Sequence, residues 1–331
     1  MFKFPKGLYV DVRIEENFKT KISFKKLTLE EQKIRKHKGA FIRVFDGQRW
    51  YYSSTTDING IQAQIDTLAS MAAPNPNILQ HPIVKAFEVN QETILQYETD
   101  SVTDIPVEEK QRLLERYLAL IKDPVIVHHS SFYVDNKIIK SIYTSKGTAV
   151  TFDKQTCGIR INLELSCGEN KNQTSASKGG VSFEGLLNLE DYFQREFEKS
   201  VDFTREAELV TPGEYPVLLS PEATGVFTHE SFGHKSESDF MVGDETMKVE
   251  WALGKRIGQD LLTIIDDGTV LGNGYVPYDD EGTKGRKTHI ITEGILSGRL
   301  HSTATAALLE EPLTGNARAV NFEFEPIVRM T

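Results

Sequence analysis

The chain has 331 residues, of which 39 % are apolar and 26 % are charged, a balance typical of a globular protein rather than a disordered or fibrous one. Its net charge of −10 argues against nucleic acid as a direct partner, since the basic residues form no run longer than the short stretch around Lys33, Arg35 and Lys36. No segment approaches the roughly 18 apolar residues of a membrane span, and no apolar signal region opens the sequence, so we expect a cytoplasmic protein without membrane contact.

The first part of the chain mixes strand and helix patterns. Apolar and polar side chains alternate over residues 8–15, which predicts a half-buried strand. Asp46-Gly47 lies between two further strand-like runs and predicts a hairpin. Helical spacing is expected over residues 29–36 and 61–73, and the Pro/Asn cluster at 74–77 after the second helix is a candidate joint.

The middle of the chain reads as an antiparallel meander between two helices. The helices are predicted over residues 107–121 and 183–199, and the polar segment 168–180 is expected to be an exposed loop. Strands are predicted over residues 125–133, 138–143, 149–152 and 159–165, with turns at 135–136 and 145–147. Cys157 and Cys167 are expected to be reduced thiols, because no secretion signal accompanies them.

Pro212-Gly213 suggests a main boundary near Thr211, with an N-terminal α/β domain over residues 1–211 and a C-terminal domain over 212–331. In the second domain, strands are expected at 215–219, at 262–265 and on both sides of Glu293-Gly294, and a short helix at 303–309. The predicted fold class is therefore α+β, with mixed strands and helices followed by an incomplete, β-rich C-terminal domain.

The strongest chemical signal lies at the start of this second domain. Ser220 and Pro221 are suited to the N-cap and first position of a helix that carries His229, Glu230 and His234. Two imidazoles can bind zinc, and a glutamate beside the first can take a proton from zinc-bound water. Five residues on a regular α-helix rotate by about 500°, which would leave the two histidines roughly 140° apart. We therefore predict a π-bulge between His229 and His234, of the kind found at functional sites.

Other interpretations of these residues stay open at this point. The two histidines could be unrelated polar residues of an amphipathic helix. Glu237 and Asp239 could orient the imidazoles or act as a substitute ligand, or they could be solvated charges. The segment Asp279-Asp280-Glu281 is expected to be a turn whose carboxylates accept backbone amides rather than a second metal site. Arg318 and Arg329 could bind a peptide carboxylate or form pairs within the fold, and His128 and His129 are expected on opposite faces of a strand.

Several motifs, taken in order, resemble the TldD/PmbA family of metallopeptidases over the whole chain. The first is H-E-x-x-x-H-x-x-E-x-D-F from His229 to Phe240. Motifs also occur on the N-terminal side, at Tyr9 to Arg13 and Val44 to Gly47, and after the first motif, at 266–269, 279–283, 314–318 and 329–331.

The resemblance implies that His229 and His234 bind Zn2+ and that Glu230 is the general base in the hydrolysis of unfolded or flexible polypeptides, including the maturation of small peptides. It implies a catalytic, TldD-type subunit that forms a homodimer or a heterodimer with a PmbA-type subunit. In the family the third ligand is a Cys beyond the Arg-Met-Thr motif, and this sequence has no matching position, so we expect a shortened form with an incomplete site. The alternatives are a non-catalytic subunit that pairs with an active partner, and a modulator of DNA gyrase.

Overall fold

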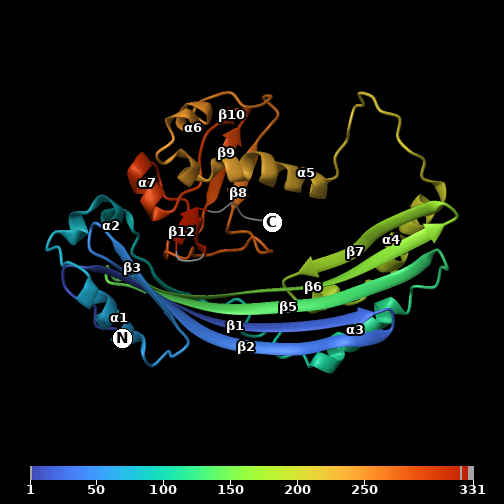
Figure 1. Cartoon of the computed structure of the whole chain (residues 1–331), viewed down its shortest axis with the longest axis horizontal. Coiled ribbons are helices and arrows are strands. Elements are labelled where there is room, and N and C mark those ends of the chain that lie inside the picture. Colours follow the sequence, from blue (N-terminus) through green and yellow to red (C-terminus); the bar gives the residue numbers. More distant parts are fainter. Residues whose placement is uncertain (1, 321–322, 327–331) are drawn as a thin grey trace.

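One long, curved sheet dominates the structure, a computed structural model that describes residues 2–320 and 323–326 (Figure 1). Its strands follow the order β3-β2-β1-β5-β6-β4, and β7 pairs with the other end of β6. All pairings are antiparallel except that of β4 with β6. The strands are β1 (Tyr9–Lys25), β2 (Thr28–Phe45), β3 (Trp50–Thr55), β4 (Gln91–Ile94), β5 (Ile126–Thr144), β6 (Ala149–Cys167) and β7 (Asn170–Gly180).

Helices cover the convex face of this sheet (Figure 1). At one end, Ile61 and Ile65 of α1 (Ile61–Met71) pack on β1 and β2. At the other end, α3 (Val107–Leu118) and α4 (Glu190–Glu206) enclose the largest core, which includes Tyr117, Tyr133 and Phe193. A short helix, α2 (Pro82–Ala86), lies near the first end. The predicted hairpin at Asp46-Gly47 and the helices at 61–73 and 107–121 are confirmed, whereas the second long helix begins later than predicted, at Glu190.

Two predictions about the sheet were wrong because tertiary partners override local signals. Residues 29–36 are not helical but belong to β2, which pairs with β1 along its whole length. Asp135-Asn136 is not a turn but lies in the middle of β5, so the two predicted strands are one. The Asp135 carboxylate is buried there, 2.6 Å from Lys110 Nζ, and it accepts the Thr20 backbone N–H at 3.0 Å.

Two further predictions failed at the edges of the fold. The polar segment 168–180 is not a loop; it forms β7, whose pairing with β6 runs from Cys167–Asn170 to Cys157–Gly180. Its polar composition suits a strand at the edge of a sheet with little burial on either side. The strand expected at 215–219 is absent from the described structure, where this stretch is an exposed connection between α4 and α5 (Figure 1).

The rest of the chain forms a smaller body on the concave side of the sheet (Figure 1). Its core contains Trp251, Ile264, Ile291, Leu296 and Leu300. Among the described residues, no helix is long and apolar enough to cross a membrane. The elements are α5 (Pro221–Thr228), α6 (Glu245–Glu250), β8 (Ile264–Asp267), β9 (Lys287–Thr292), β10 (Ile295–Leu296), α7 (Thr303–Leu309), β11 (Ala317–Val320) and β12 (Glu323–Pro326). The α+β class is therefore confirmed, and the strands around Glu293-Gly294 and the helix at 303–309 lie where they were predicted.

Buried ion pairs join this smaller body to the sheet. Arg43 of β2 contacts Asp11 Oδ2 at 2.8 Å and Glu281 Oε1 at 3.2 Å, and all three side chains are at most 5 % exposed. Asp280 contacts Arg13 at 2.6 Å and Lys140 at 2.7 Å. Because Asp280 and Glu281 come from the smaller body and the cations that they contact come from β1, β2 and β5, these pairs fix its position on the concave face.

Candidate metal centre

The predicted start of the metal-site helix is confirmed. The Ser220 hydroxyl accepts a hydrogen bond from the Ala223 backbone N–H at 3.2 Å, and Pro221 occupies the first helical position. Both features stabilise the first turn. Proline has no N–H that would lack a partner there, and the Ser220 hydroxyl accepts from an N–H that would otherwise lack one. The H-E-x-x-x-H segment follows α5 directly in the chain.

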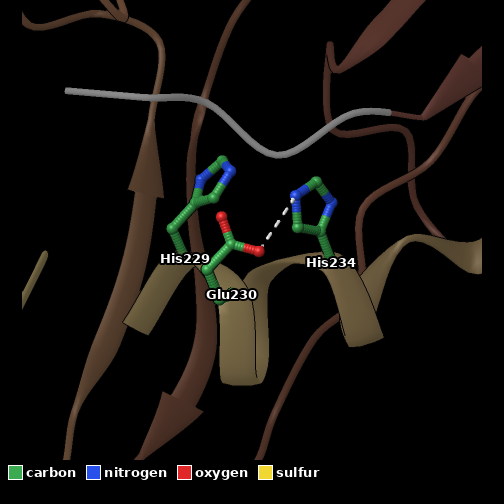
Figure 2. Close-up of side chains that lie close together, drawn as sticks. All are labelled: His229, Glu230 and His234. Carbon is green, nitrogen blue, oxygen red and sulfur yellow. Dashed lines mark ion pairs between the residues drawn. The ribbon is translucent and has the colours of Figure 1, made fainter. Parts of the chain in front are cut away.

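The predicted π-bulge is also confirmed. Residues His229–Gly233 form a π-helical turn in which the His234 backbone N–H donates to the His229 carbonyl, five residues back. This wider turn returns His234 to the face of His229, and the two ring centroids lie 4.5 Å apart. Both histidines and Glu230 project from one side of the helix (Figure 2).

These three side chains are grouped closely enough to hold a metal ion. One ligand atom from each of His229, Glu230 and His234 lies within 4.8 Å of the other two. Glu230 Oε2 is 3.9 Å from His234 Nε2, and the Glu230 side chain is 64 % exposed. An exposed carboxylate beside two imidazoles is open to solvent and to a substrate, as a general base must be.

Glu237 has a distinct position, against the far nitrogen of His234. Its Oε1 lies 3.0 Å from His234 Nδ1, and the Glu237 side chain is only 10 % exposed. An ionised carboxylate only accepts hydrogen bonds, so this contact places the proton of the neutral ring on Nδ1 and leaves the Nε2 lone pair available. This is the arrangement by which carboxylates orient the imidazole ligands of metals.

Two buried polar atoms near the site have no hydrogen-bond partner among the described residues, namely His229 Nδ1 and Asp239 Oδ1. Burial raises the pKa of the Asp239 carboxyl group. Asp239 lies outside the group formed by the two histidines and Glu230. Two imidazoles, one of them oriented by a carboxylate, fit zinc as two of the three protein ligands that a catalytic zinc site uses.

The segment after the histidines is anchored to the smaller body by residues that the sequence did not single out. Ser236 Oγ donates to the Phe232 carbonyl at 2.8 Å and accepts from Trp251 Nε1 at 3.2 Å. The Ser236 carbonyl accepts from the Leu300 N–H at 2.8 Å, and Ser238 N–H donates to the Leu300 carbonyl at 3.0 Å. No local pattern could indicate contacts that span 15 or more residues of sequence.

The Asp279-Asp280-Glu281 segment forms the turn that was expected. Asp279 accepts backbone amides from Glu281, Thr283 and Ala317 at 2.9 to 3.0 Å. Gly282, which follows, has a φ of +78°, a conformation that favours glycine.

The other candidates also lie away from the histidine pair. Cys157 and Cys167 are both unpaired thiols of β6, as expected, and burial raises the pKa of Cys157 to about 12. His129 is buried whereas the adjacent His128 is not, in agreement with opposite faces of β5. Arg318 lies close enough to Lys154 to lower the pKa of that amine, and Arg329 lies outside the described residues.

Comparison with known protein families gives matches in two parts of the chain and relatives along its whole length. Residues 212–331 match the family description "PmbA/TldA metallopeptidase C-terminal domain", and residues 10–73 match "PmbA/TldA metallopeptidase domain 1". A metalloprotease of Methanocaldococcus jannaschii is 29 % identical over 98 % of this chain and 72 % of its own length. A zinc metalloprotease TldD homolog of Saccharolobus solfataricus is 27 % identical over 100 % of this chain and 74 % of its own length.

Solved structures share the fold. A Thermotoga maritima protein, named as a proposed modulator of a DNA gyrase, superimposes with a TM-score of 0.78 at 19 % identity, over 98 % of this chain and 73 % of that one. TldE from Thermococcus kodakarensis superimposes with a TM-score of 0.70 at 15 % identity, over 97 % of this chain and 73 % of that one.

Proposed function

Because this chain belongs to the TldD/PmbA family of metallopeptidases, we propose that it is the zinc-dependent, catalytic type of subunit and hydrolyses peptide bonds in unfolded or flexible polypeptides. The observation that carries this proposal is the π-helical turn. It brings two imidazoles and a carboxylate to one face, which a regular helix with this spacing would not do. A distorted helix is less stable than a regular one, so its presence at this motif supports a functional role.

Each residue has a role that follows from its position. His229 and His234 hold the ion, and Glu237 keeps the His234 ring in the tautomer that leaves Nε2 free. When bound, zinc polarises a carbonyl group and lowers the pKa of its water. Glu230, exposed and beside His234, takes the proton from the attacking water and delivers it to the leaving amine.

A catalytic zinc site uses a third protein ligand beside two imidazoles. The family resemblance implies a cysteine, but Cys157 and Cys167 lie on β6 and neither joins the histidine group. Neither candidate substitute joins the group either, because Glu237 is engaged with His234 Nδ1 and Asp239 lies outside it.

Pairing with a second subunit is supported by exposed apolar side chains on α5 and on the connection that leads to it. Leu209, Leu218 and Phe227 are 100 %, 99 % and 53 % exposed, and all three lie on the connection to α5 or on α5 itself. Such a concentration is unusual for a monomer surface and typical of an interface. We propose that this surface is covered in a homodimer or in a heterodimer with a PmbA-type subunit.

The alternative is a non-catalytic subunit that binds polypeptides beside an active partner, which a site with two imidazoles favours. The two functions differ in the need for Glu230. We expect Glu230→Gln to lower peptide hydrolysis roughly 10²- to 10⁴-fold while zinc remains bound. Glu222→Gln, which removes the same charge from an exposed position of the same helix, should leave hydrolysis unchanged. Equal activity of both variants would refute the catalytic role and favour the binding subunit.

A further inference from the structure

A groove lined by basic residues runs between β1 and β2 on the concave face of the sheet. It has a volume of about 350 Å3 and is lined by Lys19, Lys21, Glu31, Lys33, Arg35 and Val134. We propose that this groove, the β1–β2 basic groove, binds an acidic, extended segment of a polypeptide substrate. The inference rests on the proposed function for the identity of the ligand as a substrate, but its test does not depend on hydrolysis.

The register of the strands places like charges opposite each other. Lys19 lies directly across from Arg35, and Lys21 lies directly across from Lys33. Directly opposed like charges destabilise a sheet, whereas opposite charges at the same positions would stabilise it. Two successive pairs of this kind on one face form an arrangement that an anion would stabilise.

Carboxylates of the protein offset little of this charge. Lys21 pairs with Glu31 at 2.6 Å, but Lys19, Lys33 and Arg35 form no ion pair within the described part of the chain. The hydrogen bond from Lys21, together with the charges of Lys21, Lys33 and Arg35, lowers the pKa of Glu31, which reflects a positive local potential. The groove therefore keeps an excess of positive charge in a protein whose net charge is −10.

The groove lies on the same face of the sheet as the smaller body that carries the metal centre. Side chains of β1 alternate between faces, so Lys19 and Lys21 share the face of Arg13, which contacts Asp280 of the smaller body at 2.6 Å. A second, wider hollow of about 640 Å3, lined by Arg13, Glu15 and His37 among others, lies along the same two strands. A polypeptide on this face could extend along the strands toward the smaller body (Figure 1).

The chemistry of the groove favours an acidic peptide over a nucleic acid. Alternate residues on a strand are about 7 Å apart, so the Lys19/Lys21 and Lys33/Arg35 rows match acidic side chains at every second position of an extended peptide. Glu15 and Glu31 line the two hollows and would repel a continuous phosphate backbone. The net charge of −10 also repels anions at long range, and it repels a polyphosphate chain more strongly than a short acidic peptide.

The test is binding of a short fluorescent peptide with Glu at alternate positions, followed by anisotropy at low ionic strength. The full chain is used, and EDTA is present so that the peptide is not hydrolysed by a metal-dependent activity. Loss of peptide binding and loss of peptidase activity are therefore measured independently. We expect Lys19→Gln/Arg35→Gln to weaken binding about tenfold, an effect that shrinks as salt is raised. The matched control is Lys36→Gln/Lys38→Gln, which removes the same charge from the opposite face of β2, where Lys36 lies over the Phe18 ring and Lys38 pairs with Glu16.

The proposal is supported if the acidic peptide binds more tightly than its Gln analogue and only the groove variant loses that preference. Removal of opposed like charges should also leave the melting temperature of the groove variant unchanged or higher, which excludes misfolding as the cause. The proposal is overturned if the two double variants bind the peptide equally, since the lysines would then only protect the edge of β2 from aggregation. It is also overturned if a single-stranded oligonucleotide of equal charge binds more tightly than the peptide.

Discussion

Replacement of Arg43 by methionine should destabilise the protein more than any loss of a surface charge. Arg43 contacts both Asp11, on β1, and Glu281, in the smaller body, and all three side chains are at most 5 % exposed. Its guanidinium group also lies 4.3 Å from the centre of the Trp50 ring. Methionine can fill part of this space, but two buried carboxylates would lose their cation.

The magnitude follows from this burial. Removal of one partner from a buried ion pair typically costs about 3 to 5 kcal/mol, because the remaining charge is left uncompensated away from water. Retained hydrogen bonds limit the loss, since the Thr303 N–H still donates to Glu281 Oε2 at 2.7 Å. We therefore expect a loss of about 3 kcal/mol in the free energy of unfolding for Arg43→Met.

The assay is urea unfolding followed by far-ultraviolet circular dichroism, because Trp50 fluorescence would respond to the substitution itself. The control is Lys38→Met, on the same strand, whose ion pair with Glu16 is about half exposed on both sides and should contribute less than about 1 kcal/mol. If Arg43→Met cost no more than Lys38→Met, the reasoning from burial would be refuted.

Three further predictions follow from other residues. Burial alone would raise the pKa of Glu311, but His301 and Arg299 lower it below its ordinary value. The ionised Glu311 therefore stabilises the fold at pH values above the ordinary glutamate pKa, and this stabilisation is lost as pH falls. The difference in melting temperature between wild type and Glu311→Gln should vanish in acid. Burial, with Arg318 and Lys140, lowers the pKa of Lys154 from 10.5 to about 8, so the charged amine destabilises the folded state at pH 7. Lys154→Met should therefore raise the melting temperature at pH 7. This gain should disappear as pH rises from about 8 to above 10.5. Ser220→Ala should cost about 1 kcal/mol of α5 stability and weaken zinc affinity in a competition assay, whereas an unchanged affinity would show that the cap does not support the site.

The sequence predicted the local structure around His229 and His234 better than it predicted the sheet. The helix cap at Ser220 and the π-helical turn both follow from local chemistry, since the spacing of His229 and His234 is incompatible with convergence on a regular helix. Residues close in sequence determine such features. Orientation of an imidazole was one of three interpretations of Glu237, and only its position against His234 Nδ1 in the structure favours it.

The long strands could not be predicted, because distant partners determine them. Asp135 has the residue type of a turn, but Lys110 of α3 neutralises it inside β5. The polar composition of β7 is compatible with a loop as well as with an edge strand. The spacing of apolar residues in 29–36 is compatible with a helix as well as with a strand. The Arg43 contact with Glu281 joins residues 238 positions apart, and no local signal indicates it.

Metal content tests the central claim most directly. The purified chain, equilibrated with zinc and freed of excess, would be measured by elemental mass spectrometry beside His234→Ala and beside His289→Ala, which removes an exposed histidine of β9. We expect nearly one zinc per chain for the wild type and for His289→Ala, and a loss of most of it for His234→Ala. Zinc retained equally by all three proteins, or absent from all three, would contradict the assignment of His229, Glu230 and His234 as a metal centre.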